Sequence, residues 1–177
     1  RFNIFLSCFI FLFASCATVP SRINPPLEVV SNVNIEKYLG RWYEIARYPN
    51  WFQENCYGAT ADYNLNKNGS ISVINRCKEN QLDGIFREAV GTANVVDIDT
   101  NAKLKVSFYW PFYGDYWIIG LGDNYEYSIV SEPKRQYLWI LSRKSIINKN
   151  LYDKLIEILE EHHFDTSLLI HSSQEKR

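Results

Sequence analysis

Short runs in which apolar and polar residues alternate make up most of the chain after residue 40. This period of two is typical of strands that bury one face. Turn-forming stretches such as Asn66-Lys67-Asn68-Gly69 separate the runs, since Asn and Gly favour tight turns. The pattern predicts eight strands, at residues 42–48, 58–65, 70–76, 85–93, 103–109, 116–121, 125–131 and 137–143.

The connections between these runs are short, so consecutive strands are expected to be antiparallel neighbours. Eight such strands that close on themselves form an up-and-down barrel, whose interior can hold one small ligand. An open sandwich would need longer crossover connections than this sequence provides. We therefore predict an all-β fold, an eight-stranded antiparallel up-and-down β-barrel.

A helical pattern follows the last predicted strand. Residues 150–162 place Leu151, Leu155, Ile158 and Leu159 on one face. Apolar residues at this spacing are typical of an amphipathic helix. We expect a C-terminal α-helix packed outside the barrel.

The N-terminal segment reads as a targeting signal. Residues 2–13 are almost wholly apolar, follow Arg1 and precede small residues, which is typical of a secretory signal peptide. The ending Phe13-Ala14-Ser15-Cys16 resembles the bacterial lipobox, in which cleavage precedes a cysteine that is then lipidated. That resemblance implies a signal peptide at residues 1–15 and a lipid anchor on Cys16. An ordinary signal cut nearby and a buried apolar segment remain the alternatives.

Residues 16–34 contain three prolines and little periodicity, so we expect a tether between the anchor and the folded domain. The residue after Cys16 is Ala17 rather than Asp, which resembles the sorting pattern of outer-membrane lipoproteins. The barrel and its helix are assigned to residues 35–172, and residues 173–177 to a flexible tail.

Composition narrows the class of protein. Aromatic residues make up 15% of the chain, and the apolar fraction of 46% is ordinary for a globular protein. The net charge of −1 argues against a strongly basic nucleic-acid-binding protein. All three histidines lie near or beyond the predicted helix, so the sequence indicates neither a metal centre nor a catalytic triad in the barrel. We expect no cofactor and no nucleic-acid partner.

Two of the four cysteines are left for the folded domain once Cys8 is removed with the signal and Cys16 is lipidated. Cys56 and Cys77 lie nearly symmetrically about the turn at residues 66–69, so a hairpin brings them together. An even pair in an oxidising compartment predicts a cross-strand disulfide. Two unpaired buried thiols are the alternative.

Three sequence motifs resemble those of the lipocalins, in the branch that contains bacterial outer-membrane lipocalins and apolipoprotein D. The first is Gly40-Arg41-Trp42-Tyr43-Glu44-Ile45-Ala46-Arg47. Asp123-Asn124-Tyr125 stands where the family carries its second motif, and Tyr137-Leu138-Trp139-Ile140-Leu141-Ser142-Arg143 matches the third. The resemblance covers about residues 35–172 and implies the same barrel.

The first and last strands of a closed barrel are neighbours, so Trp42 and Arg143 are expected to meet. A guanidinium stacked on an indole is a cation–π contact. We therefore interpret Gly40, Trp42 and Arg143 as structural residues that plug the closed end, and not as ligand contacts.

Strand alternation predicts which side chains face the interior. If Trp42 points inward, Glu44, Ala46 and Tyr48 follow it. An inward carboxylate such as Glu44 needs a partner or becomes protonated. The sequence leaves open whether Glu44 pairs with a basic residue or faces water.

Five residues are candidate ligand contacts. The resemblance to apolipoprotein D implies Tyr63, Asn75 and Trp139, and alternation along the fifth and last strands adds Phe108 and Tyr137. Such a lining suits an apolar ligand with a small polar head. The alternative is that inward aromatic residues simply fill a small barrel. The aromatic stretch Trp110-Pro111-Phe112-Tyr113 is compatible with a barrel rim, a membrane-touching edge or packing.

The resemblance implies a lipid-anchored lipocalin at the bacterial outer membrane, facing the periplasm. It would bind and store or transport a fatty acid such as palmitate, or a lysophospholipid. An enzyme on the same barrel, an isomerase or reductase, is the alternative and would have to use Glu44 or the tyrosines. A transmembrane barrel would need uniformly apolar outward faces, which the lysines and arginines of the predicted strands disfavour. The sequence does not indicate an oligomeric state.

Overall fold

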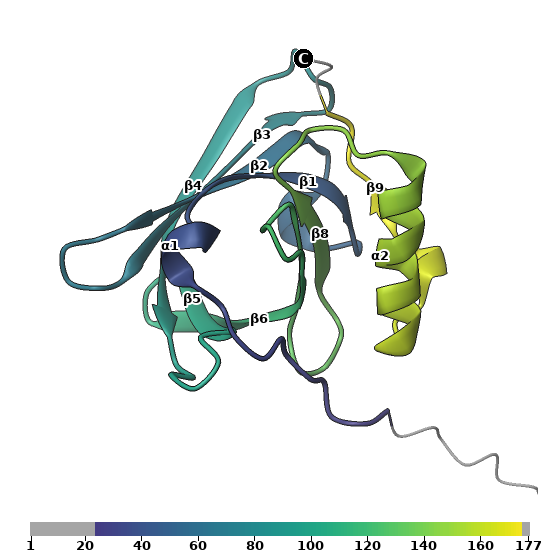
Figure 1. Cartoon of the computed structure of the whole chain (residues 1–177). Helices are drawn as coiled ribbons and strands as arrows, with labels where there is room; N and C mark the ends of the chain where they lie inside the picture. Colours follow the sequence, from purple (N-terminus) through teal and green to yellow (C-terminus); the bar gives the residue numbers. More distant parts are fainter. Residues whose placement is uncertain (1–23, 175–177) are drawn as a thin grey trace, which may run out of the picture.

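The computed structural model describes residues 24–174 and shows a closed β-barrel with a helix against its outer wall (Figure 1). Its strands are β1 (Gly40–Arg47), β2 (Cys56–Leu65), β3 (Ile71–Glu79), β4 (Phe86–Val95), β5 (Lys103–Tyr109), β6 (Phe112–Leu121), β7 (Tyr127–Ser131), β8 (Leu138–Ser142) and β9 (Ile170–His171). Its helices are α1 (Ile35–Tyr38), η1 (Trp51–Gln53), α2 (Lys149–Glu161) and η2 (Thr166–Leu168).

Strands β1 to β8 each pair antiparallel with the next, and β1 pairs with β8 to close the ring. The predicted eight-stranded up-and-down barrel is therefore confirmed, as is the C-terminal helix outside it. Boundaries differ by a few residues, the most at β6, which begins at Phe112 rather than at 116. The sequence did not predict α1, η1, η2 or β9, which are short.

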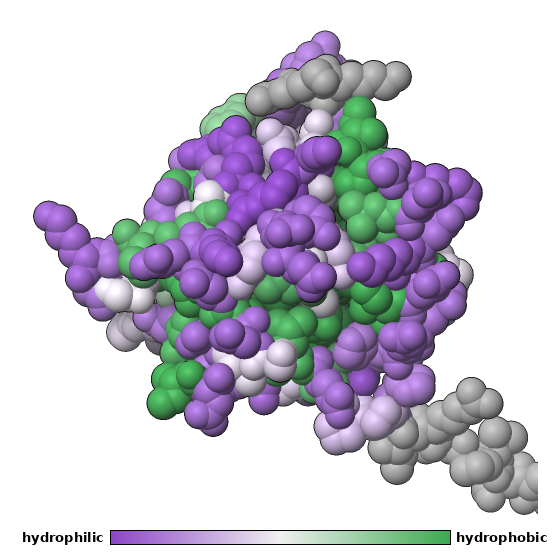
Figure 2. Space-filling view, viewed as in Figure 1, coloured by the Kyte–Doolittle hydropathy of each residue, from purple (hydrophilic) through white to green (hydrophobic). Residues whose placement is uncertain are grey.

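Chain direction defines two ends of the barrel. The connections at residues 48–55, 80–85, 110–111 and 132–137 lie at one end, called here the open end. The other end carries α1 and is called the closed end. Polar residues (purple) cover most of the face that carries α1, with apolar groups (green) between them (Figure 2).

Two apolar clusters hold the fold together. The inner cluster fills the closed half of the barrel and includes Trp42, Tyr63, Val73, Ile118 and Leu141. The outer cluster joins the barrel wall to α2 and includes Ile45, Ile129, Ile140, Leu155 and Leu159. Asn148 caps α2, because its side chain accepts a hydrogen bond from the Leu151 amide. Burial of both clusters stabilises the barrel and fixes the helix on its outside.

A bulge in β1 changes the facing of its second half. Glu44 pairs with Leu141, but Ala46 pairs with Ile140, so the register shifts by one residue between them. The expectation that Ala46 and Tyr48 face the interior is therefore wrong, since both are buried in the outer cluster. Arg47 faces the interior in their place.

The chain before α1 packs on the barrel. Leu27 and Val33 are buried, and the Val30 and Val33 amides donate to the carbonyls of Ile118 and Thr100 at 3.0 and 2.7 Å. This stretch falls within the expected tether, so the packed part of the chain begins before residue 35. The proposed signal peptide, Cys16 and residues 175–177 lie outside the described residues.

The C-terminal segment lies between β1 and β2 where these two strands no longer pair with each other. Pairing between β1 and β2 reaches only Tyr43 and Thr60. Beyond that point β9 pairs with β1, the Gly58 amide donates to the Ser173 carbonyl at 2.8 Å, and Gln174 Nε2 donates to the Glu44 and Ala59 carbonyls. Residues 173 and 174, expected in the tail, are thus part of the wall.

Between residues 24 and 174, none of the helices combines the length and hydropathy of a membrane span.

Candidate ligand-binding site

Trp42 and Arg143 seal the closed end. Arg143 Cζ lies 3.8 Å from the centre of the Trp42 ring, and Trp42 Nε1 donates to the Tyr38 carbonyl at 2.9 Å. Arg143 also donates to the carbonyls of Arg41 and Lys37, both at 2.8 Å. The guanidinium therefore ties β1 and α1 to the end of β8.

Gly40 allows this close approach. It has a φ of +91°, a backbone conformation that residues with a Cβ rarely adopt. A Cβ at this position would lie 3.6 Å from Arg143 Nη1. The structure thus brings together the three residues that the sequence assigned to a plug.

Three tyrosine hydroxyls form the floor of the interior. Tyr116 Oη lies 2.8 Å from Tyr38 Oη and 2.9 Å from Tyr63 Oη. Ser128 Oγ lies 2.9 Å from Tyr38 Oη. Burial raises the pKa of Tyr38 to about 12, and it also raises the pKa values of Tyr63 and Tyr116. The floor is therefore polar but uncharged at neutral pH.

Inner-face residues in the open half are accessible to solvent. Asn75 pairs with Ala61 on β2 and with Ala89 on β4, and directly paired residues share a face. Because Ala61 belongs to the inner cluster, Asn75 and Ala89 point inward, yet both are exposed. Phe108 is 45% exposed, and a Cβ on Gly91 would come within 2.8 Å of its ring. The barrel interior is thus accessible beyond the inner cluster.

An aromatic group lies on the wall formed by β8. Tyr137 and Trp139 stack with ring centres 6.0 Å apart. Phe52 of η1 lies 5.7 Å from Tyr137 and 6.3 Å from Trp139, measured between ring centres. Both residues of the stack are half-buried, so their faces can contact a ligand that enters from the open end.

The structure brings together two of the five predicted ligand residues, Tyr137 and Trp139. Asn75 and Phe108 lie on β3 and β5, across the ring of strands from β8. Tyr63 belongs to the floor, where it is buried. The five residues therefore line different levels and walls of one interior.

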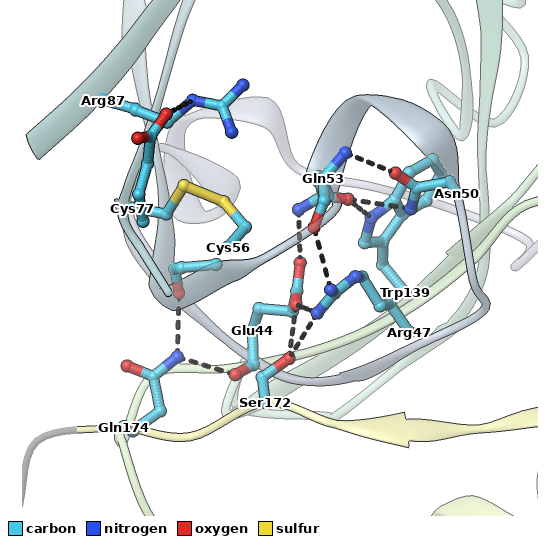
Figure 3. Close-up of a disulfide and its surroundings, with 12 residues drawn as sticks. Glu44, Arg47, Asn50, Gln53, Cys56, Cys77, Arg87, Trp139, Ser172 and Gln174 are labelled. Carbon is cyan, nitrogen blue, oxygen red and sulfur yellow. Dashed lines mark hydrogen bonds and ion pairs between the residues drawn. A yellow bond between two sulfur atoms is a disulfide. The ribbon is translucent and has the colours of Figure 1, made fainter. Parts of the chain in front are cut away.

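Glu44 has a basic partner (Figure 3). Both Glu44 and Arg47 are buried, and Arg47 Nη1 donates to Glu44 Oε1 at 2.9 Å. Gln53 Nε2 donates to the other carboxylate oxygen at 2.7 Å, and the Ser172 hydroxyl donates to Oε1. The carboxylate is thus compensated by donors from β1, η1 and the C-terminal segment, as a buried charge requires.

Gln53 links this ion pair to the aromatic group. Its side-chain oxygen accepts from Trp139 Nε1 at 2.8 Å and from Asn50 Nδ2 at 3.0 Å. Its carbonyl accepts from Arg47 Nη2 at 3.0 Å. Through its side chain and its carbonyl, Gln53 therefore holds η1 beside the inner wall at the open end.

The Cys56–Cys77 disulfide joins β2 to β3, with Cα atoms 5.5 Å apart. The predicted cross-strand bridge is confirmed. It lies near the open end, close to the Glu44 network (Figure 3).

Sequence reasoning missed four residues of the interior: Tyr38, Phe52, Gln53 and Tyr116. Tyr116 alternates with the buried Ile118, which could have placed it inside. Phe52 stands beside Trp51 in an otherwise polar connection, which is also a usable signal.

Within residues 24–174, no cluster of three or more His, Cys, Asp or Glu side chains has the arrangement of a metal site.

Comparison with known proteins gives consistent results. A family model described as "Lipocalin-like domain" matches residues 33–174. The outer membrane lipoprotein Blc of Vibrio cholerae is 39% identical over 173 residues, which cover 97% of this chain and 98% of that protein. Apolipoprotein D of Macaca fascicularis is 33% identical over 86% of this chain and 82% of its own. The solved structure of insecticyanin from Manduca sexta aligns with a TM-score of 0.71 and 19% identity over 86% of each chain.

A closed eight-stranded barrel with one plugged end and an accessible interior defines a class of small β-barrel proteins that can enclose one ligand. The family model and the relatives identify the group within that class. The chain belongs to the lipocalin family.

Proposed function

We propose that this protein is a lipid-anchored lipocalin that binds and stores or transports an amphiphile at the outer membrane. The ligand class that suits the interior is a fatty acid or a lysophospholipid. The observation that carries the proposal is the accessible inner face, which combines Phe108, Tyr137 and Trp139 with the amide of Asn75. Apolar walls with a few polar groups suit a ligand with an acyl chain and a polar head.

The energetics of burial support this ligand class. A chain of about 16 carbons gains about 12 kcal/mol at about 0.8 kcal/mol per CH₂. Lost translational and rotational freedom offsets part of this gain. A net affinity in the micromolar range or tighter is therefore expected.

The arrangement of Glu44 supports binding rather than catalysis. Arg47 and Ser172 donate to one of its oxygens and Gln53 to the other. The tyrosines of the floor have raised pKa values through burial, so they are poor proton donors at neutral pH. Neither group is poised for the acid–base chemistry that an isomerase or reductase would need.

Anchoring through Cys16 is supported by the lipobox-like Phe13-Ala14-Ser15-Cys16 and by the relative named as an outer membrane lipoprotein. A mass spectrum of the chain purified from a bacterial envelope tests it. An acylated N-terminal Cys16 is expected, and an unmodified Cys16 would overturn this part of the proposal.

Ligand binding is tested by native mass spectrometry of the full chain carrying Cys16→Ser, produced in an oxidising compartment and purified without detergent. We expect added mass that matches a fatty acid or lysophospholipid and is released on denaturation. An empty protein should take up added palmitate. A protein that binds neither ligand class more tightly than about 100 μM, which corresponds to about −5.5 kcal/mol, would rule out the carrier function.

A further inference from the structure

Large apolar side chains are exposed on three of the four connections at the open end and the strand ends beside them. We call this set the aromatic rim; its members are Trp51, Phe52, Ile85, Phe86, Tyr109, Trp110, Phe112 and Tyr113. Trp51 and Trp110 are 80% and 78% exposed. Exposed apolar surface that gathers at one end of a folded domain indicates an interaction site.

The opposite end of the barrel differs in composition. In the described part of the chain, its exposed large apolar residues are Leu65, Val96 and Ile98, together with Ile146 on the segment that follows β8. All four are aliphatic, and none is aromatic. Trp and Tyr are the residues that favour the headgroup level of a bilayer, so the rim, and not the closed end, has the composition of a membrane-contacting surface.

The course of the N-terminal segment provides an independent observation. The fourth connection at the open end carries Arg135, and Arg135 Nη2 donates to the Pro25 carbonyl at 2.9 Å. Arg135 Nε also donates to the His162 carbonyl at 2.9 Å, which fixes the guanidinium against α2. The described chain therefore begins at the open end, beside the rim.

The length of the intervening chain limits where a lipid on Cys16 can lie. Pro25 follows Cys16 by nine positions, a stretch that spans at most about 30 Å when fully extended. A lipid anchor on Cys16 would thus join the barrel from its open end, and this attachment point favours the open end as the one next to the membrane surface.

We propose that the aromatic rim inserts into the headgroup region of the membrane that carries the anchor. The barrel then opens directly onto the bilayer, and an amphiphile passes between membrane and interior without crossing bulk water. An interfacial surface of this kind lies about 5–10 Å deep at the boundary of headgroups and acyl chains. This inference rests on the proposed lipid anchor and extends it to the orientation of the barrel.

Fluorescence quenching in vesicles tests the contact. The full acylated chain is reconstituted into vesicles of phosphatidylethanolamine and phosphatidylglycerol, with or without brominated acyl chains, and the vesicles are isolated by flotation. Brominated lipids should quench a large part of the tryptophan emission. The variant Trp51→Phe/Trp110→Phe should lose most of that quenching, because the three remaining tryptophans lie within the barrel wall or its interior. Unquenched wild-type emission, or absence of the protein from the vesicles, would overturn the proposal.

The rate of ligand transfer tests whether an amphiphile passes from the membrane into the barrel through the aromatic rim. We compare Trp110→Ser/Phe112→Ser with the matched closed-end variant Val96→Ser/Ile98→Ser, and measure the rate at which labelled palmitate moves from vesicles to the barrel. The rim variant should slow transfer at least tenfold while its affinity for palmitate in solution stays unchanged, and the closed-end variant should match the wild type. Equal rates in all three proteins would contradict transfer through the rim. A wild-type protein that is quenched by brominated lipid but binds no palmitate would retain the membrane contact and refute only the proposed ligand.

Discussion

The guanidinium of Arg143 stacks on the ring of Trp42, with Cζ 3.8 Å from the ring centre. Trp42 lies on β1 and Arg143 directly follows β8, so the contact links the first and last strands of the closed ring. Trp42 is fully buried, so Trp42→Ala should lower the free energy of unfolding by about 3–5 kcal/mol. Urea denaturation followed by circular dichroism measures this change. An unchanged midpoint would show that the contact does not stabilise the fold.

Glu44 and Arg47 form a buried ion pair inside the open half. Removal of one charge leaves the other unpaired, so Glu44→Gln should lower the free energy of unfolding by about 3–5 kcal/mol. The double variant Glu44→Gln/Arg47→Met removes both charges and should be more stable than Glu44→Gln alone. Denaturation of the two single variants and the double variant completes the cycle. Strictly additive losses would mean that the two side chains do not interact.

The disulfide closes a loop with a sequence separation of 21. Loop-closure entropy for that length predicts a loss of about 3 kcal/mol when Cys56 and Cys77 are both replaced by serine. The double variant should keep its β-rich circular dichroism spectrum and unfold at a lower temperature. Addition of reductant to the wild type should lower its melting temperature by the same amount. The control is the double variant with reductant, and an equal further decrease there would show that the reductant acts elsewhere.

The burial of three tyrosines predicts that the stability of the fold declines at alkaline pH. Burial raises the pKa of Tyr38 from 10.0 to about 12 in the folded protein. The unfolded chain therefore loses this proton first, and the stabilisation that is complete below pH 10 should decline as the pH rises toward 12. Unfolding free energies across this range measure the slope. Tyr38→Phe should reduce this slope, to which Tyr63 and Tyr116 also contribute, while the exposed control Tyr113→Phe should leave it unchanged.

Much of the barrel could be predicted because alternation recurs in eight strands that short connections join. The exceptions are local. The bulge between Glu44 and Ala46 adds one residue and reverses the facing of Ala46 and Tyr48, and nothing in the residue types marks that insertion. The two-residue strand β9 depends on pairing with β1 across the whole fold, so its own sequence is too short to indicate it.

The candidate site was predicted less completely, for a related reason. Trp42 and Arg143 could be paired from strand order alone, because ring closure makes their strands neighbours. The partners of Glu44 could not, since Arg47 reaches it only through the bulge, and Gln53 and Ser172 come from a short helix and the C-terminal segment. Contacts that depend on connections carry no periodic signal in the sequence.

Trp139 is a predicted ligand contact that also hydrogen-bonds to the short helix at the open end. Its ring stacks on Tyr137, and its indole N–H donates to Gln53. Trp139→Ala should weaken palmitate binding at least tenfold, which is about 1.4 kcal/mol, because an apolar inner surface is removed. Trp139→Phe keeps a ring for the ligand and loses only the hydrogen bond, so its affinity should lie closer to the wild type. Titration of each variant with palmitate by calorimetry measures the difference.

The matched control for this prediction is Trp117→Ala. Trp117 lies on the outer face of β6, where Lys103 Nζ is 4.6 Å from its ring centre, so it cannot contact a ligand inside the barrel. Trp117→Ala should leave the affinity for palmitate unchanged even where it lowers the melting temperature. If both alanine variants lost affinity equally, the loss would reflect the stability of the barrel rather than a contact, and the assignment of Trp139 to the binding wall would fail.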